Sequence, residues 1–179
     1  MLIASLRKIR SQNAWKSSSE KAGSFNPYSA YTKVADEYLA KVPANKIIMG
    51  FPFYTNRWST KDSSPRAQKK GNGGGGLILY GDAHAEAKVF GRKYLDSQKS
   101  AYYSYYECKD NPVGWRQVYF DDEKAQTAKF GVANTKSLKG VGFWTFNQNK
   151  EIDTWLALYN SFADTSRVGA PSKKQGANP

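Results

Sequence analysis

The chain has 179 residues and a formal net charge of +12 at pH 7, with 27 Lys and Arg against 15 Asp and Glu. Hydrophobic residues make up 40% and aromatic residues 15% of the sequence. This is enough for a core, so the chain is not disordered along its whole length. No apolar run approaches the roughly 18 residues that a membrane-spanning helix needs, so we do not expect the chain to be a transmembrane protein. The length suits one domain or a piece of one.

The chain contains one cysteine, Cys108, and one histidine, His84, so it forms no internal disulfide and has no Cys/His set at zinc-ligand spacing. We therefore expect no metal and no cofactor, and we interpret His84 as a surface residue. Basic residues occur in short groups at 7–10, 69–70 and 173–174. Because they are spread along the chain, a solvated basic surface is favoured over a patch that binds nucleic acid or lipid.

An amphipathic helix is expected at 27–41. Asn26 supplies a capping side chain and Pro27 has the fixed φ that suits the first helical position. Apolar and aromatic residues then recur at helical spacing, which indicates packing against a sheet. The next segment, KIIMGFPFY at 46–54, is apolar without alternation, which is typical of a fully buried parallel strand.

The composition changes to Lys, Ser, Gly and Asn from residue 55 to about 100, which indicates an insertion. Its run GNGGGG at 71–76 lacks the Lys and Ser or Thr that follow a phosphate-binding loop, so we interpret it as a flexible turn. A weak helical pattern covers 83–95. The tyrosine-rich segment 102–106 and the alternating WRQVYF at 115–120 indicate antiparallel strands beside the main sheet.

Helix and strand patterns return in the last third of the chain. Three acids at 121–123 open a helix that runs to about Thr135, where they act as caps rather than as a catalytic pair. The segment GVGFWTF at 140–146 predicts a second buried strand beside the first. A final helix follows, and its apolar residues share one face: Ile152, Trp155, Leu156, Tyr159 and Phe162. We expect residues 164–179 to form a disordered tail.

Three blocks, KIIMGFPFYTNRW at 46–58, VYFDDEKAQTAKF at 118–130 and KGVGFWTFNQN at 139–149, resemble in this order the carboxy-terminal part of family 18 glycoside hydrolases. That family comprises chitinases and chitinase-like lectins. The resemblance covers 26–162 and implies an α/β fold, the carboxy-terminal portion of a (β/α)8 TIM barrel with a small α+β insertion between its last two strands. It implies five segments: a polar stretch at 1–25, a barrel helix and seventh-type strand at 26–54, the insertion at 55–119, a helix, eighth-type strand and final helix at 120–163, and the tail at 164–179.

The resemblance implies sugar-binding roles for three residues. Trp144 matches the eighth-strand tryptophan that forms the hydrophobic floor under the sugar, since an indole face packs well on a pyranose; the local pattern alone favours a core tryptophan. Tyr54 matches the tyrosine of the family pattern Gly-x-Pro-x-Tyr-Gly-Arg, together with Gly50 and Pro52. Arg57 fits that pattern only with a one-residue shift. The resemblance implies that Tyr54 donates a hydrogen bond to substrate and that Arg57 contacts a neighbouring sugar, while the alternative for Arg57 is a plain surface charge.

The family's catalytic acid belongs to an Asp-x-x-Asp-x-Asp-x-Glu motif that occurs nowhere in these 179 residues. In the family, this Glu protonates the glycosidic oxygen while the acetamido oxygen of the substrate attacks the anomeric carbon. We therefore expect no catalytic residue in the chain and no activity of the chain by itself.

The resemblance implies a fragment of a chitinase-like glycoside hydrolase that acts on β-1,4-linked N-acetylglucosamine polymers by substrate-assisted retaining hydrolysis. The alternative is a non-catalytic, lectin-like protein that binds chitin. Expected partners are chitin or N-acetylglucosamine oligosaccharides, with no nucleic acid and no membrane. The resemblance also implies secretion, although the segment MLIASLRKIR at 1–10 has its apolar and charged parts in the reverse order of a signal peptide.

Overall fold

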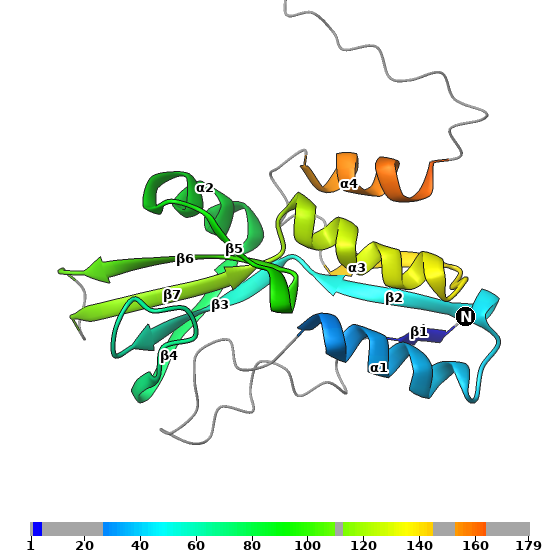
Figure 1. The fold of residues 1–179 in the computed structure, drawn as a ribbon, viewed down its shortest axis with the longest axis horizontal. Helices are drawn as coiled ribbons and strands as arrows, with labels where there is room; N and C mark the ends of the chain where they lie inside the picture. The colour runs from blue at the N-terminus through cyan, green and yellow to red at the C-terminus, as the bar shows by residue number, and fades with distance from the viewer. Residues whose placement is uncertain (1, 5–26, 110–112, 145–152, 164–179) are drawn as a thin grey trace, which may run out of the picture.

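The structure, a computed structural model, describes residues 2–4, 27–109, 113–144 and 153–163. Its helices and strands follow the chain as β1 (Leu2–Ala4), α1 (Pro27–Leu39), the 3-10 turn η2 (Ala44–Lys46), β2 (Ile47–Pro52), β3 (Tyr54–Thr60), β4 (Lys69–Leu79), α2 (Tyr80–Phe90), β5 (Lys93–Leu95), the 3-10 turn η3 (Asp96–Gln98), β6 (Ser100–Glu107), β7 (Gly114–Phe120), α3 (Glu123–Thr135), β8 (Gly140–Trp144) and α4 (Asp153–Phe162). The parallel strands with α1, α3 and α4 lie toward one end, and the antiparallel strands with α2 lie toward the other (Figure 1).

Within the described ranges, the first sheet has three parallel strands in the order β1-β2-β8. Its register pairs Leu2 with Ile47 on one side of β2, and Pro52 with Trp144 on the other. The prediction of neighbouring parallel strands at 46–54 and 140–146 is therefore confirmed. The strand β1 was not predicted, because three residues are too few to show a pattern.

Strand β2 is buried on one face and partly exposed on the other. On the buried face Phe51 stacks on Tyr31 of α1 at a ring distance of 4.6 Å and meets the edge of Phe130 of α3 at 5.1 Å. Along the other face Ile48 and Pro52 stay half-exposed. The expectation of a fully buried strand is wrong for the described residues, since α1 and α3 both pack on the face of β2 that carries Phe51.

The second sheet is antiparallel, with strand order β4-β3-β7-β6-β5, and α2 packs on one of its faces. The small residues Ala83 and Ala87 bring this helix close to Val118 and Phe120 of β7. The antiparallel strands predicted at 102–106 and 115–120 are confirmed as β6 and β7. The helix expected at 83–95 is present, but it begins at Tyr80 and ends at Phe90.

The glycine-rich run at 71–76 lies within strand β4, which pairs with β3. The prediction of a flexible turn is therefore wrong. Gly71 and Gly76 have φ values of 63° and 83°, and the pairing shifts register between Asn56 and Trp58. Glycine adopts positive φ without a steric penalty, so the run can follow an irregular strand pairing that most residues resist. Without side chains, no alternation marks such a strand in the sequence.

His84 is buried, with only 3% of its surface exposed. Its ring lies 4.5 Å from that of Tyr80 and 5.0 Å from that of Phe120. The interpretation of His84 as a surface residue is wrong, because Tyr80, Ala83, His84 and Ala87 share the face of α2 that turns toward the sheet.

Helix α3 begins with the cap that the acidic cluster predicts. The Oδ1 atom of Asp122 accepts a hydrogen bond from the N–H of Ala125 at 3.0 Å, and Glu123 occupies the first turn. Both features stabilise a helix start, since they satisfy a free N–H and oppose the positive end of the helix dipole. The interpretation as a cap is confirmed for Asp122 and Glu123, whereas Asp121 pairs with Lys129 instead.

Helix α4 confirms the predicted final helix, but it packs through small residues. Thr154 and Ala157 are fully buried, whereas Trp155 and Phe162 are 48% and 38% exposed. Asn26, Ile152 and the tail at 164–179 lie outside the described residues. Among the helices of the described ranges, none is both long enough and apolar enough to span a membrane.

Candidate functional site

Trp144 is the last residue of β8 and is 68% exposed. The preceding residue, Phe143, packs into the core and stacks on Phe53 at a ring distance of 4.6 Å. Because successive side chains of a strand point to opposite faces, the indole of Trp144 lies on the face away from α1 and α3. The alternative of a core tryptophan is therefore wrong.

The sheet face beside Trp144 carries two glycines together with Ile48 and Pro52. Gly50 of β2 and Gly142 of β8 are partners in the register, and a Cβ at Gly142 would lie 3.4 Å from the Cγ2 of Ile48. An exposed indole next to glycines offers a flat apolar surface, which suits the C–H face of a sugar ring. It also lies at the carboxyl ends of parallel strands, where (β/α)8 enzymes bind their ligands.

Tyr54 begins β3 and is half-buried. It follows Phe53, whose N–H donates a hydrogen bond to the carbonyl oxygen of Trp144 at 2.8 Å. Burial raises the pKa of Tyr31 well above its ordinary value, and the charges of Asp121 and Tyr54 raise it further. Tyr54 is therefore the neighbour in sequence of the residue that is hydrogen-bonded to Trp144. It also lies close enough to Tyr31 to affect its pKa.

Arg57 is bound to helix α2. Its Nη2 pairs with Oε1 of Glu86, and the Oε2 of Glu86 accepts a hydrogen bond from the hydroxyl of Tyr103 at 2.6 Å. The guanidinium Cζ also lies 5.9 Å from the ring centre of Tyr105. Burial by itself lowers the pKa of Arg57, but the hydrogen bond and charge of Glu86 outweigh it, so the pKa is raised. The sequence could not reveal this partner, because Arg57 and Glu86 are 29 positions apart.

Asp121 forms an ion pair with Lys129 that the sequence analysis missed. The side chain of Lys129 is 1% exposed and that of Asp121 is 19% exposed. The Lys129 ammonium also lies 5.6 Å from the ring centre of Tyr31. Since Asp121 is paired and Asp122 caps a helix, both carboxylates have structural partners.

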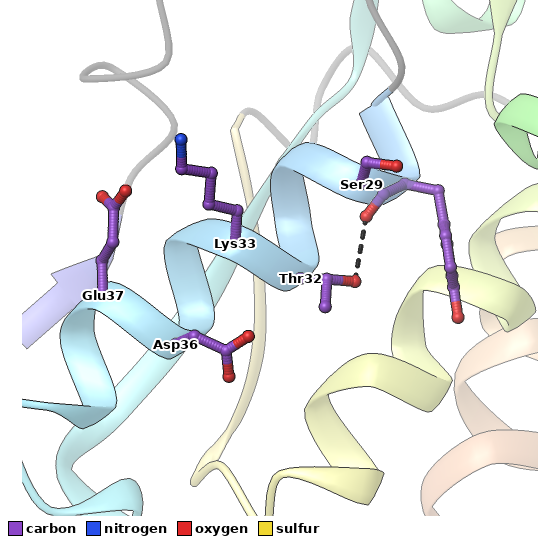
Figure 2. Close-up of a pocket in the computed structure, with 6 residues that line it drawn as sticks. Ser29, Thr32, Lys33, Asp36 and Glu37 are labelled. Carbon is purple, nitrogen blue, oxygen red and sulfur yellow. Dashed lines mark hydrogen bonds between the residues drawn. The ribbon is translucent and has the colours of Figure 1, made fainter.

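A shallow depression follows the outer side of α1 (Figure 2). The described residues that line it come from this helix: Tyr28, Ser29, Thr32, Lys33, Asp36 and Glu37. The hydroxyl of Thr32 donates to the carbonyl oxygen of Tyr28 at 3.1 Å, the usual contact of a helical threonine. Among the residues that the structure describes, no group from a neighbouring element converges on this depression. In the described part of the chain, no three His, Cys, Asp or Glu residues gather to hold a metal ion.

The family model for glycosyl hydrolases family 18 matches residues 8–149. The chain is 23% identical over 141 residues to the cortical fragment-lytic enzyme of Bacillus subtilis. The aligned region covers 76% of this chain and 30% of that protein. It is 28% identical over 120 residues to a class V chitinase of Lotus japonicus. This aligned region covers 62% of this chain and 28% of that protein. The chain thus spans 30% or less of the length of these curated relatives.

Solved structures show the same fold. A family 18 chitinase from Cycas revoluta in complex with (GlcNAc)3 matches with a TM-score of 0.58 and 21% identity, over 71% of this chain and 36% of that one. A chitinase-like agglutinin from Robinia pseudoacacia matches with a TM-score of 0.56 and 20% identity, over 73% of this chain and 35% of that one. The mixed α/β structure is consistent with a fold related to the TIM barrel. With the family model matched over residues 8–149, the chain belongs to glycosyl hydrolases family 18, as its three sequence blocks predict.

Proposed function

We propose that this chain supplies part of the substrate site of a chitin-active protein, with Trp144 as the platform for an N-acetylglucosamine unit. The observation that carries this proposal is the 68% exposure of Trp144 at the carboxyl end of β8. A large apolar side chain exposed beside glycines is favourable for ligand contact. The likeness to a class V chitinase and to a chitinase in complex with (GlcNAc)3 supports the choice of sugar.

Tyr54 and Arg57 are the further sugar contacts that we propose. The phenol of Tyr54 can donate a hydrogen bond to a sugar oxygen. The pair with Glu86 engages one nitrogen of Arg57, and a guanidinium carries five N–H donors, so others can reach a neighbouring sugar. Their contribution is smaller than that of Trp144, because Tyr54 is half-buried and Arg57 is 28% exposed.

Hydrolysis, in this proposal, requires a segment that carries the Asp-x-x-Asp-x-Asp-x-Glu motif. The mechanism is substrate-assisted retention, in which the Glu protonates the glycosidic oxygen and the acetamido oxygen attacks the anomeric carbon. Sequencing the transcript upstream of the Met1 codon tests this. An in-frame continuation into that motif supports a fragment of a secreted chitinase, and a stop codon directly upstream of Met1 contradicts it.

A non-catalytic chitin-binding protein is the second candidate. The specific observation in its favour is an exposed indole in a chain whose sequence lacks the catalytic acid motif. The likeness to a chitinase-like agglutinin supports it as well. Saturable binding of (GlcNAc)4 by a protein with no in-frame upstream segment is the result that this candidate predicts.

Tryptophan fluorescence titrated with (GlcNAc)4 tests the proposed platform. We expect a saturable change in emission that W144A abolishes. The matched control is W155A, because Trp155 is also an exposed tryptophan but belongs to α4. An unchanged response in folded W144A contradicts the proposal. A cello-oligosaccharide of equal length, which lacks the acetamido groups, shows whether those groups matter.

A further inference from the structure

Phe53 links the end of strand β8 to the start of helix α2. Its N–H donates to the carbonyl oxygen of Trp144 at 2.8 Å, and its own carbonyl oxygen accepts from the N–H of Tyr80 at 3.0 Å. Both main-chain polar groups of Phe53 are therefore engaged, one on each side. Phe53 thus connects the parallel sheet to the antiparallel part of the molecule.

The aromatic ring of Phe53 repeats this link. It is 1% exposed and stacks on Phe143, with ring centres 4.6 Å apart and planes 7° from parallel. The ring of Tyr80 also lies 5.3 Å from that of Phe53. Because Phe143 directly precedes Trp144, packing and hydrogen bonding fix the same end of β8.

The hydroxyl of Tyr80 is in turn held by two further helices. It accepts a hydrogen bond from Nε2 of Gln126 on α3 at 2.9 Å, and one from Oγ1 of Thr154 on α4 at 3.4 Å. Tyr80 and Gln126 are 3% and 2% exposed, and Thr154 is fully buried. Polar groups this deeply buried depend on their partners, since water cannot replace a lost hydrogen bond.

From this geometry we propose that Tyr80 is a positioning residue for Trp144. Its hydroxyl is fixed by α3 and α4, its ring and N–H fix Phe53, and Phe53 fixes the carbonyl of Trp144. In the described part of the chain, strand β8 lies at the edge of the parallel sheet, and β2, Phe53 and the packing of Phe143 on Phe130 of α3 hold this end. The proposal rests on the proposed role of Trp144 in sugar binding.

Fluorine NMR of the 5-fluorotryptophan-labelled chain tests the proposal, with the Trp144 signal assigned by its loss in W144F. We expect Y80F, which keeps the ring and removes the hydroxyl, to broaden or split the Trp144 signal. We also expect Y80F to weaken (GlcNAc)4 binding by about threefold or more, since the loss of even one of the two buried hydrogen bonds to the hydroxyl has about this size. The matched control is Y103F, which removes another buried hydroxyl, one that donates to Glu86 at 2.6 Å. Y103F should leave the Trp144 signal unchanged.

A sharp, unshifted Trp144 signal in folded Y80F overturns the proposal, and so does an equal effect of Y103F. If Y80F fails to fold, T154V removes one of the two donors to Tyr80 at nearly constant volume, and the same criteria apply. A Trp144 signal that responds to Y80F in a chain that does not respond to (GlcNAc)4 supports the positioning geometry and contradicts the proposed sugar role. A failure of the positioning role of Tyr80 can therefore be told apart from a failure of the sugar-binding role of Trp144.

Discussion

The ammonium group of Lys129 is buried against the carboxylate of Asp121, at the point where strand β7 passes into helix α3. Lys129 also lies close to the ring of Tyr31 on α1. The ion pair thereby joins the antiparallel sheet to two helices of the parallel part. A charge buried this deeply is tolerated only with a partner, so the pair is a sensitive point of the fold.

We predict that D121N destabilises the chain by about 3 kcal/mol, because it leaves the buried ammonium of Lys129 without its counter-charge. K129M should cost less, about 1 kcal/mol, since Asp121 is 19% exposed and water can solvate it. Urea unfolding at neutral pH measures both free energies. A larger cost for K129M than for D121N would contradict this order.

The cap of helix α3 gives a second prediction. D122A should lower the free energy of unfolding by about 1 kcal/mol, because the N–H of Ala125 loses its acceptor. D122N keeps a side-chain oxygen and should stay close to the wild type. Asp122 also lies 3.5 Å from Nη1 of Arg92, whose side chain is 51% exposed. If D122N costs as much as D122A in urea unfolding, the charge pair with Arg92 and not the cap is responsible.

Because of Tyr119, we expect the stability of the fold to decrease with pH in the alkaline range. Burial raises the pKa of Tyr119 to about 12, although the hydrogen bond from the N–H of Arg66 acts in the opposite direction. Because this folded-state pKa exceeds the unfolded value of about 10, neutral Tyr119 stabilises the fold below pH 10. That contribution, on the order of 2 kcal/mol, is lost as the pH rises to about 12. Urea unfolding across this range should show the loss. Y119F should make the loss smaller without removing it, because burial also raises the pKa of Tyr31 and Tyr94. An equal slope in Y119F contradicts the assignment.

Arg57 can be tested separately as a sugar contact and as a partner of Glu86. We predict that R57M weakens (GlcNAc)4 binding, but less than W144A does. E86Q is the matched control, because it removes the charge partner and keeps the cation. Their coupling in a double-mutant cycle should be about 1 kcal/mol or less, since both side chains are 28% exposed. Lower stability with unchanged affinity in R57M would leave Arg57 a purely structural role.

Elements with strong local patterns could be predicted from the sequence. The aromatic spacing of α1, the apolar runs of β2 and β8 and the acidic start of α3 each reflect local physics, and the structure has all four. Strand β1 has three residues and shows no period. The glycines of β4 have no side chains to alternate. The one-sided burial of β2 was missed because its sequence does not alternate, whereas the helices pack on a single face.

Contacts between distant residues could not be predicted. The ion pair of Arg57 with Glu86 depends on where α2 crosses the sheet, and no local pattern encodes that. The weak apolar pattern of α2 does not reveal that His84 is buried, yet its ring contacts those of Tyr80 and Phe120. The local pattern around Trp144 favoured a core position, but the side chain is 68% exposed. The structure shows why: Phe143 lies in the core, and the side chain of the next residue in the strand, Trp144, points to the opposite face of the sheet.

The most direct test of Trp144 as a sugar platform is a proton–nitrogen NMR titration of the chain with (GlcNAc)4, followed at the tryptophan indole N–H signals. The indole signal of Trp144 and the amide of Phe53 should shift progressively and saturate, while the indole signal of Trp155 stays in place. A Trp144 signal that does not move at saturating sugar, or shifts confined to Trp155, would contradict a binding role for the exposed indole at the end of β8.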